Sequence, residues 1–390
     1  MTHQPLSPFR KKHTLILLDL LDSSTLPLDT AMSKYFRAHK SLGSKDRFAI
    51  SQRIYALKRW QGAIDTKLKN PISWEGRLDA IERIELESIT SDESLPPHQR
   101  VSFPKKLYNL IENSLGSAQA FEIALNSNAR APLFIRANLL KISREKLLEI
   151  LAKEGIRARA SERAYAAIEI LQKVQFFSLN SFKEGHFEVQ DENSQKVAEC
   201  ILAKPGNIVL DYCAGSGGKA LAIAPLLEGK GQLYLHDIRV RVLDEAKKRL
   251  ARAGIQNAQR LGPNHPQLKK LRGQVDWTLV DAPCSGTGTL RRNPDLKWKF
   301  DPSRFEKLLK EQREIFKSAL QYVRPKGHIA YATCSILKEE NSDQAAFFLK
   351  EYSKSFGLKL ISEMQTYPQP HEGDGLYAAV FSVDQNPEAM

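Results

Sequence analysis

The chain has 390 residues, of which 42% are hydrophobic, and its formal net charge is +13. This length is typical of two or three domains, and the composition excludes a collagen-like or wholly disordered chain. Because neutralised phosphates release counterions, the positive charge favours a nucleic-acid partner over the alternative that it only keeps the protein soluble.

The first region, residues 1–87, is predicted to be helical. Apolar residues recur at three- and four-residue spacing in "TLILLDLL", "TAMSKYFRAHK" and "DRFAISQRIYALKRWQGAI". Residues 1–60 contain eleven Lys and Arg against four Asp and Glu, which fits an RNA-binding surface but also an ordinary solvated helical face. Residues 88–104 are polar, contain prolines and lack periodicity, so we expect a linker there.

The next region, residues 105–188, is predicted to form a small α+β unit. "APLFIRANL" has the character of a strand, "SREKLLEILAKEG" that of a capped helix ending at Gly155, and "FFSL" that of a further strand. This unit leads into the last and largest region.

Residues 189–390 alternate strands, loops and helices. "NIVLDYCAGSGGKALAIAPLL", "GQLYLHD", "DWTLVDAPCSGTG" and "GHIAYATCS" each lead from an apolar run into a loop. This alternation predicts an α/β domain with a mainly parallel sheet covered by helices on both faces. Ligands of such sheets bind at the carboxyl ends of the strands, so we expect the functional residues at those ends.

A glycine-rich loop, "CAGSGGK" (213–219), follows the first of these strands. Gly215, Gly217 and Gly218 allow a tight turn and a close approach to a ligand. Asp237 ends the next strand, nineteen residues after Gly218, near the spacing at which an acid binds ribose hydroxyls. The loop is neither the G-x-G-x-x-G fingerprint nor a P-loop, so S-adenosylmethionine fits better than a dinucleotide.

The chain contains four cysteines without the spacing of a metal site, so we predict no bound metal and no disulfide framework. Free thiols are typical of reducing compartments. The short apolar stretch near the N-terminus is interrupted by Asp19 and Asp22 and does not approach membrane-spanning length. We therefore expect a cytoplasmic protein without a membrane segment.

Two of the cysteines stand directly after predicted strands, Cys284 in "DAPCS" and Cys334 in "ATCS". A thiolate that adds to carbon 6 of a pyrimidine makes carbon 5 nucleophilic enough to accept a methyl group, and a second thiol can assist the breakdown of the adduct. Asp281 is a candidate hydrogen-bond partner for the base. For Cys200 and Cys213 we prefer the interpretation of ordinary buried thiols. Spacing alone leaves open which thiol is the nucleophile.

Several motifs resemble those of the RsmB/Sun RNA (cytosine-5)-methyltransferases. "LVDAPCSGTGTLRRNPDLKW" (279–298) and "YATCSILKEEN" (331–341) are similar to the two signature cysteine motifs of that family, and "VQDENSQKVAE" (189–199) to the entrance of its catalytic domain. Residues 13–68 resemble the NusB-related helical RNA-binding domain of many members. The resemblance implies a Rossmann-like class I methyltransferase domain over 189–390, preceded by the small α+β unit and an all-helical NusB-like domain.

The resemblance also implies roles for individual residues. Cys334 becomes the nucleophile, Cys284 assists product release, and Asp281 supports the reaction. The family's S-adenosylmethionine contacts correspond here to Cys213, Ala214, Gly215, Ser216, Gly217, Gly218, Lys219, Asp237 and Asp281. The usual loop "CAAPGGKT" is replaced by "CAGSGGKA", and the acid expected near the adenine is missing from "RLGPNHPQLKKL". Asn264 is the nearest candidate for its place.

The leading hypothesis is a monomeric enzyme that methylates carbon 5 of a cytosine in structured RNA, with ribosomal RNA favoured. Transfer RNA is an alternative substrate. A non-catalytic RNA-binding or ribosome-assembly factor is an alternative of a different class, against which both cysteines and Asp281 argue.

Overall fold

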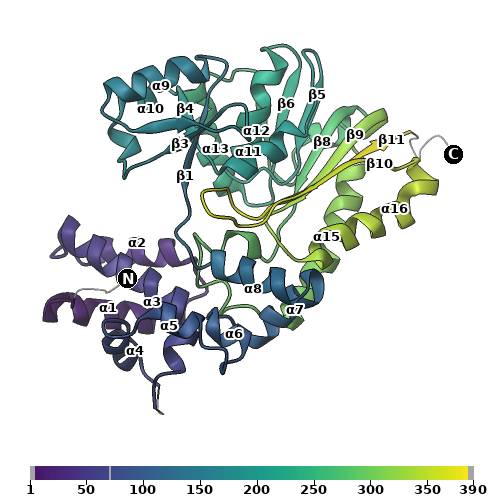
Figure 1. Cartoon of the computed structure of the whole chain (residues 1–390). Coiled ribbons are helices and arrows are strands. Elements are labelled where there is room, and N and C mark those ends of the chain that lie inside the picture. The colour runs from purple at the N-terminus through teal and green to yellow at the C-terminus, as the bar shows by residue number, and fades with distance from the viewer. Residues whose placement is uncertain (1–4, 70–71, 385–390) are drawn as a thin grey trace. The chain divides into compact units, whose positions relative to one another are not determined.

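The computed structural model describes residues 5–69 and 72–384. It divides into two compact units, which are described separately (Figure 1). Unit 1 comprises Met1–Arg130 and Thr289–Pro302, and unit 2 comprises Ala131–Gly288 and Ser303–Met390. The chain therefore passes three times between the units.

Unit 1 is helical, as predicted for the N-terminal region. Ser7 caps its first helix through a bond from the amide of Arg10, and Pro8 occupies the first helical position, where a missing N–H costs nothing. Buried apolar side chains from Leu17 to Leu86 form its main core. The helices are α1 (Pro8–Asp22), α2 (Leu28–Ala38), α3 (Ser44–Asp65), α4 (Trp74–Ile81), α5 (Leu86–Thr90), α6 (Pro97–Arg100), α7 (Lys105–Leu115) and α8 (Ser117–Asn126).

Two stretches of unit 1 differ from the predicted domain layout. Residues 88–104, expected to be a linker, contain α6 and bury Val101 and Phe103, so this segment packs as part of the helical unit. Thr289–Pro302, expected within the methyltransferase domain, also belongs to unit 1. In that segment Lys297 and Trp298 donate hydrogen bonds to backbone carbonyls of α3.

The N-terminal part of unit 2 contains an antiparallel sheet of order β2-β3-β1-β4. Its strands are β1 (Leu133–Ala137), β2 (Ala158–Ala160), β3 (Ala167–Ile170) and β4 (Phe187–Val189), and α9 (Arg144–Lys153) and α10 (Asn180–Lys183) pack with it. The predicted strand at "FFSL" is wrong. Phe176–Ser178 form a 3-10 turn (η1) that leads directly into α10, and the last strand comes later, at β4. A four-residue apolar run is too short to distinguish a strand from such a turn.

A seven-stranded sheet of order β10-β11-β9-β8-β5-β6-β7 forms the centre of unit 2. The strands from β7 to β9 pair in parallel, and β11 and β10 add an antiparallel edge. This arrangement confirms the predicted mainly parallel α/β domain. Its strands are β5 (Ile208–Asp211), β6 (Gln232–His236), β7 (Ala258–Leu261), β8 (Val275–Asp281), β9 (Val323–Thr333), β10 (Lys359–Gln365) and β11 (Tyr377–Val383).

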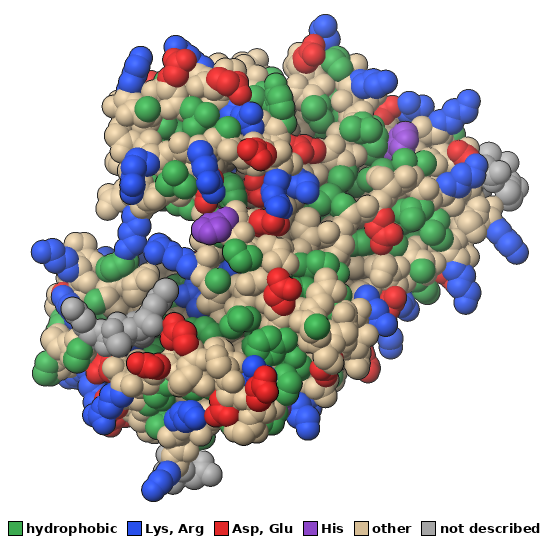
Figure 2. Space-filling model, viewed as in Figure 1, with side chains coloured by type: hydrophobic (Ala, Val, Ile, Leu, Met, Phe, Trp, Pro, Cys, Tyr) green, Lys and Arg blue, Asp and Glu red, His purple; other side chains and the backbone are tan. Residues whose placement is uncertain are grey.

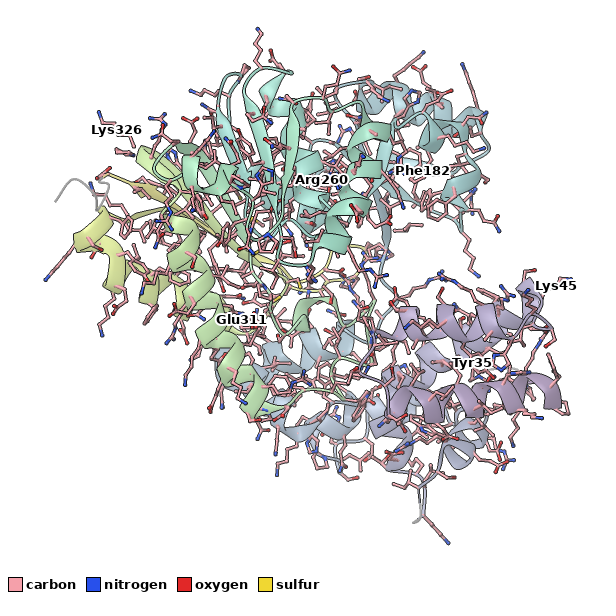
Figure 3. All side chains as sticks on the ribbon, turned by 180° about the vertical axis from the view of Figure 1, so that it is seen from behind. Tyr35, Lys45, Phe182, Arg260, Glu311 and Lys326 are labelled. Carbon is pink, nitrogen blue, oxygen red and sulfur yellow. The ribbon has the colours of Figure 1, made fainter. Side chains whose placement is uncertain are left out.

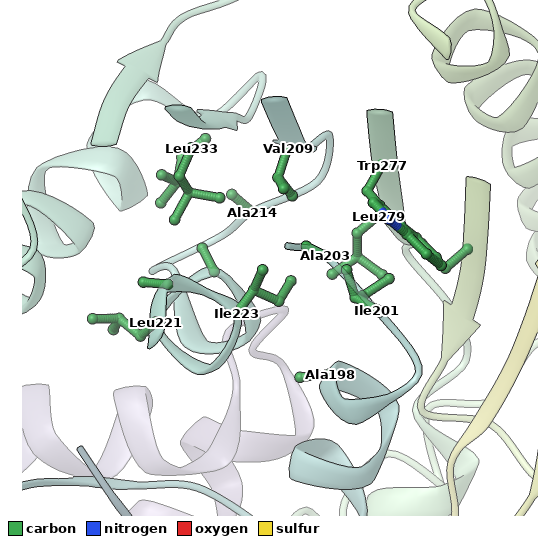
Figure 4. Close-up of a cluster of buried hydrophobic side chains, with 14 of the residues drawn as sticks. Ala198, Ile201, Ala203, Val209, Ala214, Leu221, Ile223, Leu233, Trp277 and Leu279 are labelled. Atoms are coloured by element: carbon green, nitrogen blue, oxygen red, sulfur yellow. The ribbon is translucent and has the colours of Figure 1, made fainter. Parts of the chain in front are cut away.

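Helices bury both faces of this sheet. On one face α11 (Glu192–Glu199), α12 (Gly218–Ile223) and α13 (Val240–Ala253) pack against side chains such as Val209 and Leu279 (Figure 4). On the other face α15 (Pro302–Leu320) and α16 (Ser342–Phe356) contribute Phe316 and Phe348, whose stacked rings lie 3.7 Å apart. Buried apolar area is the main stabilising contribution in such a layered domain.

The charge of the surface is mixed. Figure 2 shows Lys and Arg side chains scattered over the visible face with Asp and Glu between them, so the excess of +13 does not form one continuous patch on that face. Within residues 5–69 and 72–384, no helix combines the length and the hydropathy that crossing a membrane requires.

Candidate active site

The glycine-rich loop leads from the end of β5 into α12, and its conformation depends on glycine. Gly217 has φ +80°, and a Cβ there would lie 3.1 Å from Leu235 and 3.3 Å from Ala246. The left-handed backbone and the close packing both exclude larger residues. Gly217 thus packs the loop against the sheet while its neighbours face a cavity.

This cavity, of about 740 Å³, lies at the carboxyl ends of β5, β6 and β8, where the order of the strands reverses. Glu311 of α15, labelled in Figure 3, lines it from the side of that helix. Every predicted cofactor residue lines it except Gly217 and Asn264. The lining consists of Val189, Gln190, Ser194, Tyr212, Cys213, Ala214, Gly215, Ser216, Gly218, Lys219, His236, Asp237, Ile238, Arg239, Arg249, Asp281, Pro283, Glu311, Glu314, Ile315 and Ser318.

Asn264 is not among the residues that line the cavity. It is exposed in the loop between β7 and α14 (Gln267–Lys270), away from the residues that line the cavity. The carboxylates that α15 brings to the cavity, Glu311 and Glu314, come from a part of the sequence where no ligand contact was predicted. Alignment with a motif cannot place a side chain in a loop of different sequence, so the suggested role of Asn264 stays a prediction.

Asp237 lies directly after β6 and is 3% exposed. Its Oδ2 accepts the Gly215 amide at 2.9 Å, its Oδ1 accepts the Arg239 amide at 2.8 Å, and the Arg239 guanidinium binds both oxygens at 3.0 Å. Burial raises the pKa of Asp237, but the hydrogen bonds from Arg239 and Gly215 outweigh it and the pKa is lowered. Asp237 is therefore an anion that both shapes the loop and faces the cavity.

These features suit S-adenosylmethionine. Gly215 and Gly218 have no side chain on the cavity lining, Asp237 carries a carboxylate there, and Ile238, 71% exposed, adds an apolar side chain. A cavity of this size can hold a nucleoside with an amino-acid tail.

A chain of charged groups connects the cavity to the thiols. Lys219 Nζ lies 2.6 Å from Asp281 Oδ2, and Lys219 is close enough to Cys334 to interact with its charge. Burial lowers the pKa of Lys219, but the charge and hydrogen bond of Asp281 outweigh burial, and the pKa is raised. The ammonium therefore stays charged and can stabilise a thiolate at Cys334.

Asp211, the last residue of β5, was missed by the sequence analysis. It is 1% exposed, its Oδ1 has no hydrogen-bond partner, and burial together with the charge of Asp281 raises its pKa to about 8. In the sequence, a single acid at the end of a strand cannot be distinguished from an ordinary turn residue. Its shifted pKa marks it as part of the same electrostatic group as Lys219 and Asp281.

The two candidate thiols lie together. Cys284 Sγ and Cys334 Sγ are 3.1 Å apart, and the Cys334 amide donates to Cys284 Sγ at 3.3 Å. Both are half-buried and free. They meet because β8 and β9 are parallel neighbours, with Asp281 opposite Ala332, so both loops leave the same edge of the sheet.

The remaining two cysteines differ from this pair. Burial raises the pKa of Cys200 and of Cys213, which keeps both in the thiol form. Cys213 lines the cavity, whereas the sulfur of Cys200 bonds to the Lys196 carbonyl and to Met364. Within the residues that the structure describes, no cluster of His, Cys, Asp and Glu could hold a metal ion.

Residues of the small sheet support the glycine loop. No pattern in the sequence had indicated this support. Arg136 of β1 is buried and donates to Gln190 and, at 3.1 Å, to the Gly218 carbonyl, and burial lowers its pKa to about 10. Arg249 of α13 donates to the Ser216 carbonyl at 3.0 Å and is held by Glu188 of β4. The small sheet therefore helps to hold the cofactor loop in place.

Comparison with known proteins matches two regions of this chain to one family. Residues 199–382 match the family model described as 16S rRNA methyltransferase RsmB/F, and residues 103–176 match its ferredoxin-like domain. Ribosomal RNA small subunit methyltransferase B of Proteus mirabilis is 34% identical over 260 residues, which are 66% of this chain.

The chain belongs to the RsmB/Sun family.

Within the RsmB/Sun family, the match to this chain covers 60% of the length of the Proteus mirabilis protein. Solved structures share its fold. PH0851 superimposes with a TM-score of 0.80 at 23% identity, covering 98% of this chain and all of PH0851. NSun6 from Pyrococcus horikoshii, solved with the S-adenosylmethionine analogue SFG, gives 0.66 at 21% identity and covers 73% of this chain and 99% of NSun6.

Proposed function

We propose that this chain transfers a methyl group from S-adenosylmethionine to carbon 5 of a cytosine in RNA through a covalent bond between Cys334 and the base. The observation that supports it most directly is the pair of thiols, 3.1 Å apart, beside the Lys219–Asp281 ion pair at the edge of a nucleoside-sized cavity. Simple methyl transfer to an amine or a hydroxyl needs no such pair.

When bound in the cavity, S-adenosylmethionine supplies a methyl group on a positively charged sulfur. The thiolate of Cys334, stabilised by Lys219, forms a bond to carbon 6 of the cytosine, which makes carbon 5 nucleophilic. Carbon 5 then takes the methyl group. Loss of the carbon-5 proton to water breaks the bond between carbon 6 and sulfur, and the electron pair returns to Cys334. Cys284 assists this release.

The substrate follows from this chemistry and from the relatives. A cytosine can reach the thiols only when it is unstacked, so the target is single-stranded or flipped out of a helix. The relatives named for the small ribosomal subunit favour ribosomal RNA. Mapping 5-methylcytosine in RNA from cells with and without the protein tests the proposal. Loss of a methylated site in transfer RNA instead would change the substrate class, and cofactor binding without any lost site would favour a non-catalytic RNA-binding factor.

Substitution of the thiols tests the covalent step with purified protein, cofactor and RNA. Cys334→Ala should abolish both methylation and the covalent protein–RNA adduct. Cys284→Ala should instead accumulate a methylated adduct, visible as a slowly migrating band on a denaturing gel. If Cys284→Ala gives no adduct while Cys334→Ala does, the two roles are reversed, and if neither variant loses activity the cysteine mechanism is wrong.

We infer that unit 1 contributes to RNA binding through its exposed cations. Lys34, Arg37, Lys40 and Lys45 lie on and after α2 and are exposed. Deletion of residues 1–100 would not test this cleanly, because it would uncover Lys297 and Trp298, which bind α3. Replacing the four cations by Gln should instead weaken RNA binding and reduce its salt dependence. Lys146→Gln with Lys248→Gln, two exposed lysines that already pair with glutamates, is the control.

A further inference from the structure

The carboxylate of Glu340 is buried next to the thiol pair. Glu340 lies in η4 (Lys338–Glu340), six residues after Cys334, and is 0% exposed. Its Oε1 accepts the Ser285 amide at 2.8 Å, and its Oε2 accepts the Ser285 hydroxyl at 2.5 Å. A buried carboxylate is costly unless donors surround it, and the amide and hydroxyl of Ser285 supply such donors to Glu340.

Gln312 of α15 completes the contact. Its Nε2 donates to Glu340 Oε1 at 3.0 Å and to the Pro283 carbonyl at 3.0 Å, and its Oε1 accepts Gln344 Nε2 at 2.9 Å. Together Glu340 and Gln312 bind the backbone on both sides of Cys284. We call these two residues the Glu340–Gln312 clamp. Through it, the loop that carries Cys334 fixes the loop that carries Cys284.

The clamp makes the surroundings of the two thiols unequal. Cys334, Glu340 and Tyr331 are titratable groups that interact with Cys284. The hydrogen bond with Cys334, burial and the charge of Glu340 all raise the pKa of Cys284. Cys334, by contrast, interacts with the ammonium of Lys219, which Asp281 holds in place.

We propose that Glu340 is a positioning residue that holds Cys284 against Cys334 and keeps it a neutral thiol, so that Cys284 acts as a hydrogen-bond donor to the Cys334 sulfur. The proposal deepens the function proposed above and rests on it. When the bond between carbon 6 and sulfur breaks, the electron pair returns to Cys334 and the carbon-5 proton goes to water. The Cys284 S–H, 3.1 Å away, stabilises the departing thiolate without losing its own proton. Release then depends on Cys284, whereas addition does not.

Alkylation of the thiols by iodoacetamide tests this arrangement without RNA or cofactor, so its result does not depend on whether the protein methylates cytosine. Peptide mass spectrometry measures modification of Cys284 in Cys334→Ala and of Cys334 in Cys284→Ala between pH 6 and 10. At pH 7.5 Cys284 should react more slowly than Cys334. Adding Glu340→Gln to Cys334→Ala should accelerate alkylation of Cys284 by about tenfold, which corresponds to a shift of one pH unit in its profile.

Controls separate charge from structure. Glu339→Gln neutralises the adjacent carboxylate and should leave the profile of Cys284 unchanged, and Glu340→Asp keeps the charge and should largely restore the slow reaction. A folded Glu340→Gln variant with the unchanged profile would overturn the proposal. If that variant does not fold, the comparison of the two single-thiol variants decides, because a Cys284 more reactive than Cys334 at pH 7.5 contradicts a neutral Cys284.

Discussion

Two of the lysines buried in the described residues, one in each unit, have surroundings that differ in kind. Lys219 of unit 2 is 9% exposed and pairs with the Asp281 carboxylate at 2.6 Å. Lys297 of unit 1 is 1% exposed and donates to neutral oxygens, the Arg59 carbonyl and Asn128 Oδ1, each at 2.7 Å. Burial and the charge of Arg59 lower the pKa of Lys297 well below its ordinary value, whereas that of Lys219 is raised.

The difference indicates two roles: Lys219 acts through its charge, and Lys297 acts as a hydrogen-bond donor within the fold. An ammonium held by a carboxylate beside a cavity stays charged and can stabilise another anion. An amine that donates only to neutral oxygens, as Lys297 does beside the rings of Phe103 and Trp298, mainly satisfies buried acceptors. Lys219 therefore belongs to the chemistry of the site, and Lys297 to the packing of Thr289–Pro302 within unit 1.

The largest expected effect comes from removing the two ammonium groups in turn. Lys219→Met should reduce methylation by about tenfold to a hundredfold, because losing hydrogen bonds to charged groups typically costs about 1.5–3 kcal/mol. Lys297→Met should leave cofactor affinity unchanged and, at pH 9, lower the free energy of unfolding by about 1–3 kcal/mol, because two buried acceptors lose their donor. Single-turnover methylation, calorimetry and urea unfolding measure these effects. Equal losses of methylation in both variants would contradict the distinction.

The dependence of stability on pH should also distinguish the two lysines. The folded-state pKa of Lys297 lies below the unfolded one, so between them the unfolded chain binds more protons and stability rises with pH. The folded-state pKa of Lys219 lies above the unfolded one, so its contribution is complete below the unfolded pKa and is lost only above it.

Urea unfolding at pH 7 and pH 9 checks this prediction. The difference in unfolding free energy between the wild type and Lys297→Met should grow with pH, by at most about 1.4 kcal/mol per unit. Titration of Lys219 itself should add no pH dependence in this range, because its folded and unfolded pKa values both lie above it. A constant difference for Lys297→Met would show that this amine is charged in the folded protein.

The sequence predicted the site where its signals are local. A glycine loop, an acid and two thiols each follow a strand, and a parallel sheet brings the ends of its strands to one edge, so Asp237, Asp281, Cys284 and Cys334 could be found from their positions alone. Only the family resemblance assigned different roles to the thiols.

The residues that the sequence did not identify make contacts with residues that lie far away along the chain. Arg136 reaches Gly218, 82 positions later, and Lys297 binds a carbonyl 238 positions earlier. Such contacts depend on how whole elements pack, and no local pattern marks them. The same limit explains why residues 88–104 were expected to be a linker although Val101 and Phe103 are buried.

An effect of similar size, on cofactor binding instead of methylation, is expected at Asp237, whose carboxylate faces the cavity and is already paired. Asp237→Ala should weaken S-adenosylmethionine binding by about 1.5–3 kcal/mol, because it removes acceptors for the ribose hydroxyls. Asp237→Asn, which keeps one oxygen acceptor, should lose less. Calorimetry measures both, and circular dichroism should show a retained fold. Unchanged affinity in Asp237→Ala would remove this residue from the cofactor site.

The smallest expected effect concerns Arg239, which occupies the oxygens that the ribose would need. Its guanidinium binds both oxygens of Asp237, yet its side chain is 66% exposed. A ligand that takes over those oxygens must displace it, and an exposed ion pair of this kind contributes at most about 1 kcal/mol. Arg239→Ala should therefore strengthen cofactor binding slightly, by about fivefold at most. Arg241→Ala, which removes an exposed cation from the same helix, should leave the affinity unchanged. Weaker binding by Arg239→Ala alone would mean that the guanidinium contacts the cofactor instead of competing with it.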